Sequence, residues 1–78
     1  MARYYFHIRG GERDTTDEEG TELPDDIAAR ATALRSARGL IAADVLTGQI
    51  PTVERIDVEV QGRGRIFSIS FKEAVGLG

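Results

Sequence analysis

The feature that most constrains the fold of this 78-residue chain is a long stretch of helix-forming residues at its centre. From Asp26 to about Thr47 the sequence is rich in alanine, leucine and arginine, which favours one continuous helix. Asp25 stands at the N-cap position, and Gly48 stands just after the helix end, where glycine is common. At about 1.5 Å per residue the helix is roughly 33 Å long, longer than a strand of about seven residues, so one of its ends should extend beyond a sheet packed against it.

Three other stretches alternate between apolar and polar residues, which is the pattern of half-buried strands. They are Arg3–Arg9, Arg55–Gln61 and Arg65–Phe71, and the last two are joined by the short turn Gly62-Arg63-Gly64. The side chains expected to face inward from these strands are Tyr4, Phe6, Ile8, Ile56, Val58, Val60, Phe67, Ile69 and Phe71.

A fourth strand, short and polar, is expected at Glu12–Thr16 after the turn Gly10-Gly11, and its lack of large apolar residues places it at an edge. Asp17–Gly20 is expected to form a turn before the helix, and the tail Lys72–Gly78 one helical turn. The sequence therefore predicts a single α+β domain over residues 1–78. Its order is ββαββ, with a mostly antiparallel four-stranded sheet and one long helix packed on one face.

The apolar residues of the helix do not all lie on one side. One set recurs at helical spacing and is expected to form the buried stripe: Ile27, Ala31, Leu34, Ile41 and Val45. Arg38 falls near the centre of this stripe, whereas Leu40 points nearly to the opposite side. Two interpretations remain open. Either the buried face is centred nearer Ala37, with Arg38 and Leu40 at its edges, or Leu40 marks a second apolar surface for a partner helix.

The charge and the cysteine count exclude several classes of protein. The formal net charge is −3 and there is no cysteine. A negative total argues against general affinity for nucleic acids, because such binding depends on Lys and Arg at the phosphates. Without cysteine there is no disulfide framework and no thiolate metal site. No apolar run is long enough for a signal segment or a membrane span, so the expected location is the cytoplasm.

No catalytic, metal or cofactor site is predicted. His7 is the only histidine, and a general base needs a partner and an orienting group that the sequence does not show. His7 is expected to be solvated or at an interface, with a pH-sensitive contact as the alternative. An enzyme would need a pocket that joins His7 to carboxylates such as Asp57 or Glu59. We therefore expect a protein that is not an enzyme.

The face of the sheet that the helix leaves open should carry Tyr5, His7 and Ile66 among charged residues. Tyrosine and arginine are enriched where proteins dock, so these three residues, together with Leu40 of the helix, are the candidate interface. The sequence thus predicts a small non-catalytic protein-interaction module, acting as a homodimer or as an accessory subunit. The alternative for this face is an ordinary hydrated sheet surface.

Five arginines form a candidate basic patch: Arg30, Arg35, Arg38, Arg63 and Arg65. If they bind phosphates, the protein would be a nucleic-acid-associated regulator of the small antitoxin kind. Phosphate contacts predict a steep loss of affinity with salt, and this dependence distinguishes the alternative from a protein-interaction module.

Several segments of the sequence resemble a known family. They are Arg3-Tyr4-Tyr5-Phe6-His7, Asp17-Glu18-Glu19-Gly20-Thr21-Glu22-Leu23-Pro24-Asp25, Ala28-Ala29-Arg30-Ala31 and Ala33-Leu34-Arg35-Ser36-Ala37-Arg38. With them the chain resembles a family of short alphaproteobacterial proteins known only as a domain of unknown function. The resemblance covers nearly the whole chain, including the ending Phe67–Val75. It implies a bacterial, cytoplasmic protein, and it brings no catalytic or ligand-binding residue with it.

Overall fold

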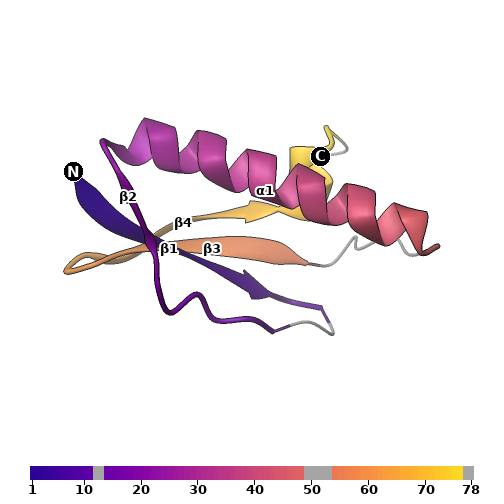
Figure 1. The fold of residues 1–78 in the computed structure, drawn as a ribbon, viewed down its shortest axis with the longest axis horizontal. Coiled ribbons are helices and arrows are strands. Elements are labelled where there is room, and N and C mark those ends of the chain that lie inside the picture. Colours follow the sequence, from indigo (N-terminus) through magenta and orange to yellow (C-terminus); the bar gives the residue numbers. More distant parts are fainter. Residues whose placement is uncertain (12–13, 49–53, 77–78) are drawn as a thin grey trace.

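A computed structural model describes residues 1–11, 14–48 and 54–76 of the chain. Within these ranges the elements follow in the order β1 (Ala2–Arg9), β2 (Thr21–Leu23), α1 (Asp26–Leu46), β3 (Arg55–Val60), β4 (Gly64–Ser70) and α2 (Phe71–Ala74). The strands form one antiparallel sheet in the order β2-β1-β3-β4, and α1 lies across one face of it (Figure 1). The predicted α+β architecture is confirmed.

β1 and β3 form the centre of the sheet, although they are far apart in the sequence. They pair from Tyr4 opposite Val60 to Arg9 opposite Arg55. Successive side chains of a strand point to opposite faces, so alternate residues of both strands meet under α1. All the residues predicted to face inward, except Ile8, belong to the hydrophobic core or pack against it. The inward and outward faces of β1, β3 and β4 are therefore largely as the alternation predicts.

The second strand lies later in the chain than predicted. The expected strand at Glu12–Thr16 is wrong: among its described residues only Thr15 pairs, through backbone hydrogen bonds of 2.9 and 3.0 Å with Ile8, and residues 12 and 13 lie outside the described part. β2 instead pairs Thr21–Leu23 with the first residues of β1. Between them is the predicted turn, in which Gly20 has a φ of +74° and a Cβ would meet the Arg3 side chain at 2.8 Å. Only glycine suits both conditions.

α1 begins and ends as the sequence predicts. The carboxylate of Asp25 accepts a hydrogen bond from the Ala28 N–H group at 2.8 Å, as an N-cap does. At the other end Thr47 is the C-cap, and Gly48 follows with a φ of +85°. The caps at both ends supply partners for backbone groups that a helix terminus leaves open.

The face of α1 that packs on the sheet differs from the predicted stripe. Its fully buried residues are Ala29, Ala33 and Ala37, whereas Ile27 is 81% exposed and Val45 is 55% exposed. The prediction of a stripe through Ile27, Ala31 and Val45 is therefore wrong, because hydropathy ranks isoleucine and valine above alanine and ignores the space available. Small side chains let the helix backbone lie close to the strands, as close packing of the interior requires.

The larger apolar residues of α1 flank this alanine row. Leu34, Leu40 and Ile41 are half-buried and pack against the core. This arrangement confirms the interpretation in which the buried face is centred near Ala37 and Leu40 closes one edge.

A β-bulge in the β3–β4 hairpin changes the direction of one predicted surface residue. Val58 pairs with Phe67, but the next residue of β3, Glu59, pairs with Arg65, so Ile66 has no residue opposite it. An extra residue in one strand bends that strand and re-aims its side chains. Ile66 consequently packs against the core beside Phe67, and its predicted place on the open face is wrong.

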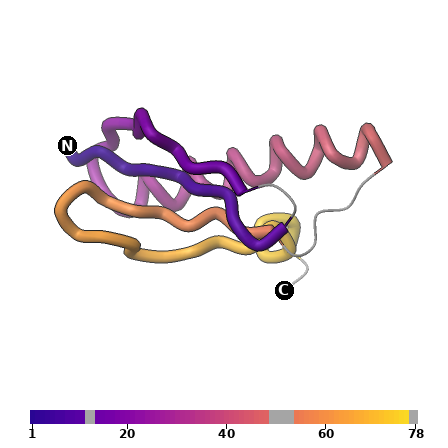
Figure 2. The backbone as a smooth tube through the Cα atoms, turned by 90° about the horizontal axis from the view of Figure 1, so that it is seen from below, coloured from indigo at the N-terminus to yellow at the C-terminus, as the bar shows by residue number. Residues whose placement is uncertain are grey.

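The C-terminal end of α1 extends beyond the sheet, as its length predicts, and Figures 1 and 2 both show it reaching past the strands. Ile41 is the last residue of the helix that packs against the core. We call residues 42–46 the α1 overhang. Among the described residues, no helix is both long and apolar enough to cross a membrane.

Candidate functional site

The open face of the sheet carries charged side chains that neutralise one another. At its centre Asp57 accepts hydrogen bonds from the Ser68 hydroxyl at 2.6 Å and from the Arg55 Nε at 2.9 Å, with an Arg65 nitrogen 3.7 Å away. Asp57 is 9% exposed although it lies on the face without a helix. Burial alone would raise the pKa of this carboxyl, but the hydrogen bonds from Ser68 and Arg55 and the two arginine charges outweigh it and lower the pKa.

His7 is buried on this same face. It is 8% exposed, so the expectation that it is solvated is wrong. Its Nδ1 accepts a hydrogen bond from the Asp17 N–H group at 3.0 Å, and its Nε2 lies 2.8 Å from a carboxylate oxygen of Glu59. A nitrogen that accepts carries no proton, so the ring is the neutral tautomer with its proton on Nε2. The ring of Tyr5 is nearly parallel to that of His7, with centroids 6.3 Å apart.

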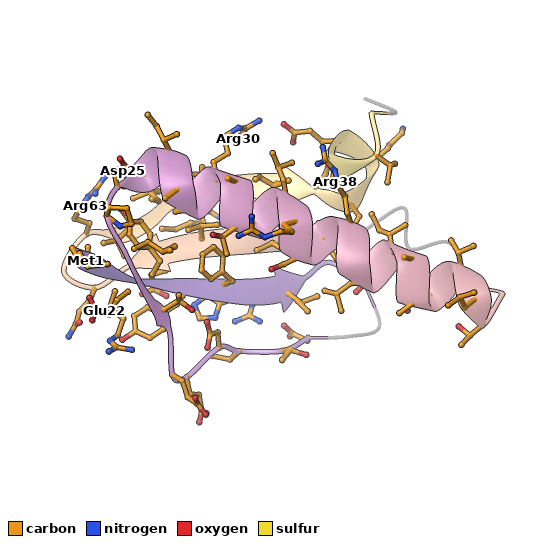
Figure 3. The ribbon with its side chains drawn as sticks, turned by 45° about the horizontal axis from the view of Figure 1, so that its top comes forward. Met1, Glu22, Asp25, Arg30, Arg38 and Arg63 are labelled. Atoms are coloured by element: carbon orange, nitrogen blue, oxygen red, sulfur yellow. The ribbon has the colours of Figure 1, made fainter. Side chains whose placement is uncertain are left out.

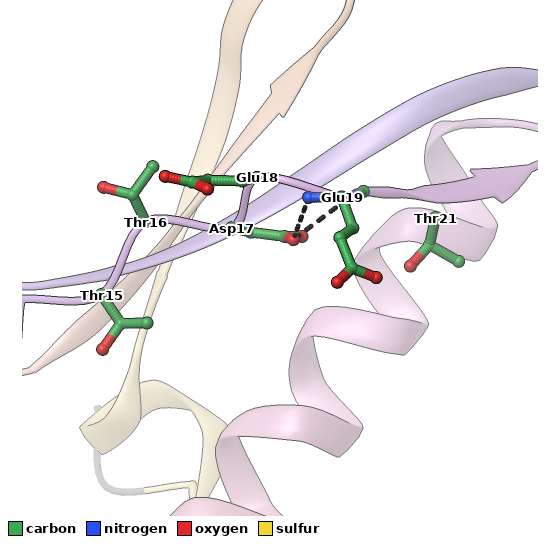
Figure 4. Close-up of a pocket in the computed structure, with 7 residues that line it drawn as sticks. Thr15, Thr16, Asp17, Glu18, Glu19 and Thr21 are labelled. Carbon is green, nitrogen blue, oxygen red and sulfur yellow. Dashed lines mark hydrogen bonds between the residues drawn. The ribbon is translucent and has the colours of Figure 1, made fainter.

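Asp17 ties the loop between β1 and β2 to the edge of β1. One carboxylate oxygen accepts from the Phe6 N–H group at 3.1 Å, and the other accepts from the N–H groups of Glu19 and Gly20 at 3.2 and 3.1 Å. Figure 4 shows this carboxylate turned toward the backbone of the loop. Burial alone would raise the pKa of Asp17, but the hydrogen bonds from the three backbone N–H groups outweigh it and lower the pKa.

The lowered pKa values of Asp17 and Asp57 predict a loss of stability in acid. The folded carboxyls have pKa values below that of an unfolded aspartate, about 3.9, so the unfolded chain takes up protons first as the pH falls. Their stabilisation is complete above about pH 5 and decreases as the pH falls through the folded pKa values. The urea midpoint should therefore be lower at about pH 3 than at about pH 6. In the double variant Asp17→Asn, Asp57→Asn the urea midpoint should decrease less between these two pH values. An equal decrease in the variant and the parent protein would contradict the attribution of the acid sensitivity to these two carboxyls.

A second cluster fixes the start of α1 to the turn of the hairpin. The hydroxyl of Tyr4, a core residue, donates to Asp26 at 2.6 Å, and Arg63 donates to both oxygens of the same carboxylate at 3.2 and 3.0 Å. The hydrogen bond to Asp26 raises the pKa of Tyr4, and the bonds from Arg63 and Tyr4 lower the pKa of Asp26. All three groups are satisfied within the fold, which indicates a structural role.

Shallow hollows lie beside the two clusters. One is lined by Tyr5, His7, Asp17, Glu59 and their neighbours, so the structure does bring His7 and Glu59 together, as an enzymatic function would require. However, one ring nitrogen of His7 accepts from Asp17 and the other donates to Glu59. Neither nitrogen is free to take a proton from a substrate in this arrangement. Within the described residues, no group of His, Cys, Asp and Glu is placed to hold a metal ion.

The arginines of the predicted basic patch do not all lie together: of the three labelled in Figure 3, Arg30 and Arg38 lie on the side of α2 and Arg63 lies apart from them. Arg63 lies at the N-terminal end of α1, and Arg38 lies beside α2, where its Nε donates to the Ala74 carbonyl at 2.8 Å. Arg65 pairs with Glu59 across the strands, on the open face. Arg30 is 3.4 Å from a Glu73 oxygen. Within the described part of the chain, two members of the set, Arg35 and Arg38, make no ion pair.

The predicted interface residues are similarly separated. Leu40 and Ile66 pack against the core from the helix side, while Tyr5 and His7 lie on the open face. No single contiguous surface of the described residues contains all four. The site that sequence reasoning located only in outline is the α1 overhang, where Val45 is 55% exposed and Leu46 is 87% exposed. The signal that points to it is the length of the helix relative to the strands.

The comparisons with known proteins give a family and nothing further. No curated protein and no solved structure matches the chain. A family model described as a domain of unknown function (DUF6894) matches residues 3–72, which is nearly the whole chain. The resemblance predicted from the sequence motifs is thereby confirmed. The chain belongs to the DUF6894 family.

Proposed function

We propose that the protein is a non-catalytic protein-interaction module of the bacterial cytoplasm, acting as a homodimer or as an accessory subunit. The observation that supports this most directly is the α1 overhang. Ala42, Ala43, Val45 and Leu46 are all exposed there, beyond the last residue of α1 that packs on the core. Apolar side chains projected on a helix are one of the common ways in which a protein fits into a groove of its partner.

The charged groups of the open face and of the predicted basic patch support the same proposal, because most of them already bind other groups of the protein. The carboxylates of the open face are bonded to Arg55, Ser68 and His7, and four of the five arginines considered for phosphate binding contact protein groups instead. Breaking such contacts to bind a nucleic acid would offset part of the gain from the phosphates. No observation favours the nucleic-acid alternative over a protein partner.

A cross-linking experiment tests the overhang directly. The sequence has no cysteine, so the variant Leu46→Cys carries a single thiol to which a photo-crosslinker can be attached. Because Leu46 lies at the proposed contact, we expect irradiation in a lysate of the native cells to give a discrete adduct, resolved by denaturing electrophoresis. An adduct of twice the chain mass would place a contact between two copies at the overhang, and an adduct of another discrete mass would identify a different protein as the partner that binds there.

The matched control is Ile27→Cys. Ile27 is also apolar, lies on α1 and is 81% exposed, but it stands at the opposite end of the helix. A discrete adduct from position 46 and none from position 27 supports the proposal. Equal adducts from both positions, or none from either, would show that the overhang is not a contact surface.

A further inference from the structure

The two edges of the sheet are protected to different degrees. β2 forms one edge and is three residues long, and beyond it the Asp17 carboxylate and the Thr15 backbone occupy the edge groups of β1. β4 forms the other edge with seven residues, and in the described part of the chain it pairs with β3 alone. Figure 2 shows β4 along the outer side of the sheet. An open edge is a template for pairing with another strand.

The register identifies which backbone groups of β4 face away from β3. The Phe71 N–H group donates to the Glu54 carbonyl at 2.9 Å, so Arg55 and Ser70 are a pair that exchanges no hydrogen bonds. The bonded and non-bonded pairs alternate along antiparallel strands, and Asp57 and Ser68 are therefore also a non-bonded pair. The N–H and C=O groups of Ser68 consequently point outward, and Ser68 is exposed.

The side chains of this edge lack the usual protection against strand pairing. Natural edges are commonly blocked by charged residues, by proline or by a bulge. The segment Ile66-Phe67-Ser68-Ile69-Ser70 has no charge, no proline and no glycine, and is rich in residues that favour strands. The bulge and Arg65 lie at the beginning of this segment, so the residues after them have neither a bulge nor a charge that would prevent pairing with another strand.

We propose that a second copy of the chain pairs with this edge, β4 against β4, antiparallel about a twofold axis at Ser68. Ser68 then faces Ser68 of the second copy, and each N–H group donates to the carbonyl of the other. Phe67 lies opposite Ile69 of the second copy, and Ile69 opposite its Phe67, an aromatic and β-branched pair of the kind that stabilises sheets. No like charges meet within the segment, and a twofold axis makes one patch complementary to itself. The result is a continuous eight-stranded sheet with both α1 helices on the same face.

This inference rests on the homodimer form of the proposed function and places the contact between the two copies at β4, not at the α1 overhang. A small core gains stability when a partner subunit extends it. The pairing leaves the α1 overhang free, so a dimer built in this way still presents two overhangs to another protein.

The experiment combines solution mass with amide hydrogen exchange on the full chain. Light scattering over a concentration series should show the mass rising to that of a dimer. Over the same series, exchange at the Ser68 amide should slow by about tenfold or more, because that N–H group passes from solvent into the ladder. The variant Ser68→Pro removes this N–H group, which β3 does not use, and edge strands tolerate proline at such positions. It should remain monomeric at concentrations where the parent protein is a dimer.

Two further variants distinguish the loss of strand pairing at the β4 edge from other effects of replacing Ser68. Ser68→Ala loses the hydrogen bond to Asp57 but keeps the edge, so it should dimerise like the parent. If Ser68→Pro does not fold, Ser68→Lys places like charges opposite each other at the twofold axis and should also be monomeric. If Ser68→Pro and Ser68→Lys still form dimers, and the Ser68 amide of the parent protein is not protected, the β4 interface is overturned and the homodimer form still stands. A monomer at every concentration would overturn both.

Discussion

Replacing Ala33 by leucine is expected to destabilise the domain by about 1–3 kcal/mol, the usual cost of adding methylene groups to a filled core. Ala33 is 0% exposed and lies in the middle of the alanine row beneath α1. A leucine there must either lift the helix from the strands or adopt a strained rotamer. A domain of this size has about 3–5 kcal/mol of stability from its core, so the loss should be visible directly in the urea midpoint.

Ala31→Leu is the matched control for this prediction. Ala31 lies on the same helix and is exposed, and leucine and alanine have similar helix propensities. Its unfolding free energy should stay within about 0.5 kcal/mol of the parent protein. If the two variants were equally stable, the alanine row would not be the surface on which α1 packs.

Replacing Asp17 by alanine is expected to cost about 2 kcal/mol, because hydrogen bonds to a charged acceptor are the stronger kind and three of them end at this carboxylate. The Phe6 N–H group would lose its acceptor at the edge of β1, and the turn at Gly20 would lose the side chain that organises it. We expect the urea midpoint to fall and the Phe6 amide to exchange faster than in the parent protein.

Asp14→Ala provides the comparison for Asp17. Asp14 also lies in the loop before β2, and its carboxylate is 2.8 Å from an Arg9 nitrogen, but its side chain is 72% exposed. Exposed ion pairs contribute about 0–1 kcal/mol, so this variant should be close to the parent protein. If Asp14→Ala cost as much as Asp17→Ala, the three backbone hydrogen bonds would not be the reason for the effect.

The strands that could be predicted from the sequence are those whose two faces differ in environment. In β1 and β3 one face meets the core and the other meets charged groups, so apolar and polar residues alternate and the alternation gives the inward set. The helix ends were equally predictable, because Asp25 and Gly48 perform local functions that depend on neighbouring backbone groups.

The features that could not be predicted depend on contacts between distant segments. β2 has three residues, too few for a periodic pattern. The buried face of α1 is set by how closely it approaches the strands, which selects alanine and leaves Ile27 exposed. Ile66 turns inward because of a bulge, and a single extra residue in a strand leaves no mark on the sequence.

Contacts between distant segments also explain why the candidate site was predicted only in part. His7 was placed on the correct face from its position in β1, but its burial comes from Asp17 and Glu59, which belong to other segments. The arginines share a charge but not one surface, since Arg30 and Arg38 contact α2 whereas Arg63 binds Asp26 at the start of α1. The α1 overhang was accessible from length alone, because the rise per residue of helices and strands is known.

The strand order has a consequence for how the chain reaches its fold during synthesis. The two central strands, β1 and β3, are separated by the loop, β2 and the whole of α1. β1 leaves the ribosome early, yet its main partner emerges only after the helix has been made. Pairing that joins distant parts of a chain is slow compared with local helix formation. The apolar face of β1 therefore stays unpaired until β3 has been made, and we expect α1 to form before the sheet beneath it is complete.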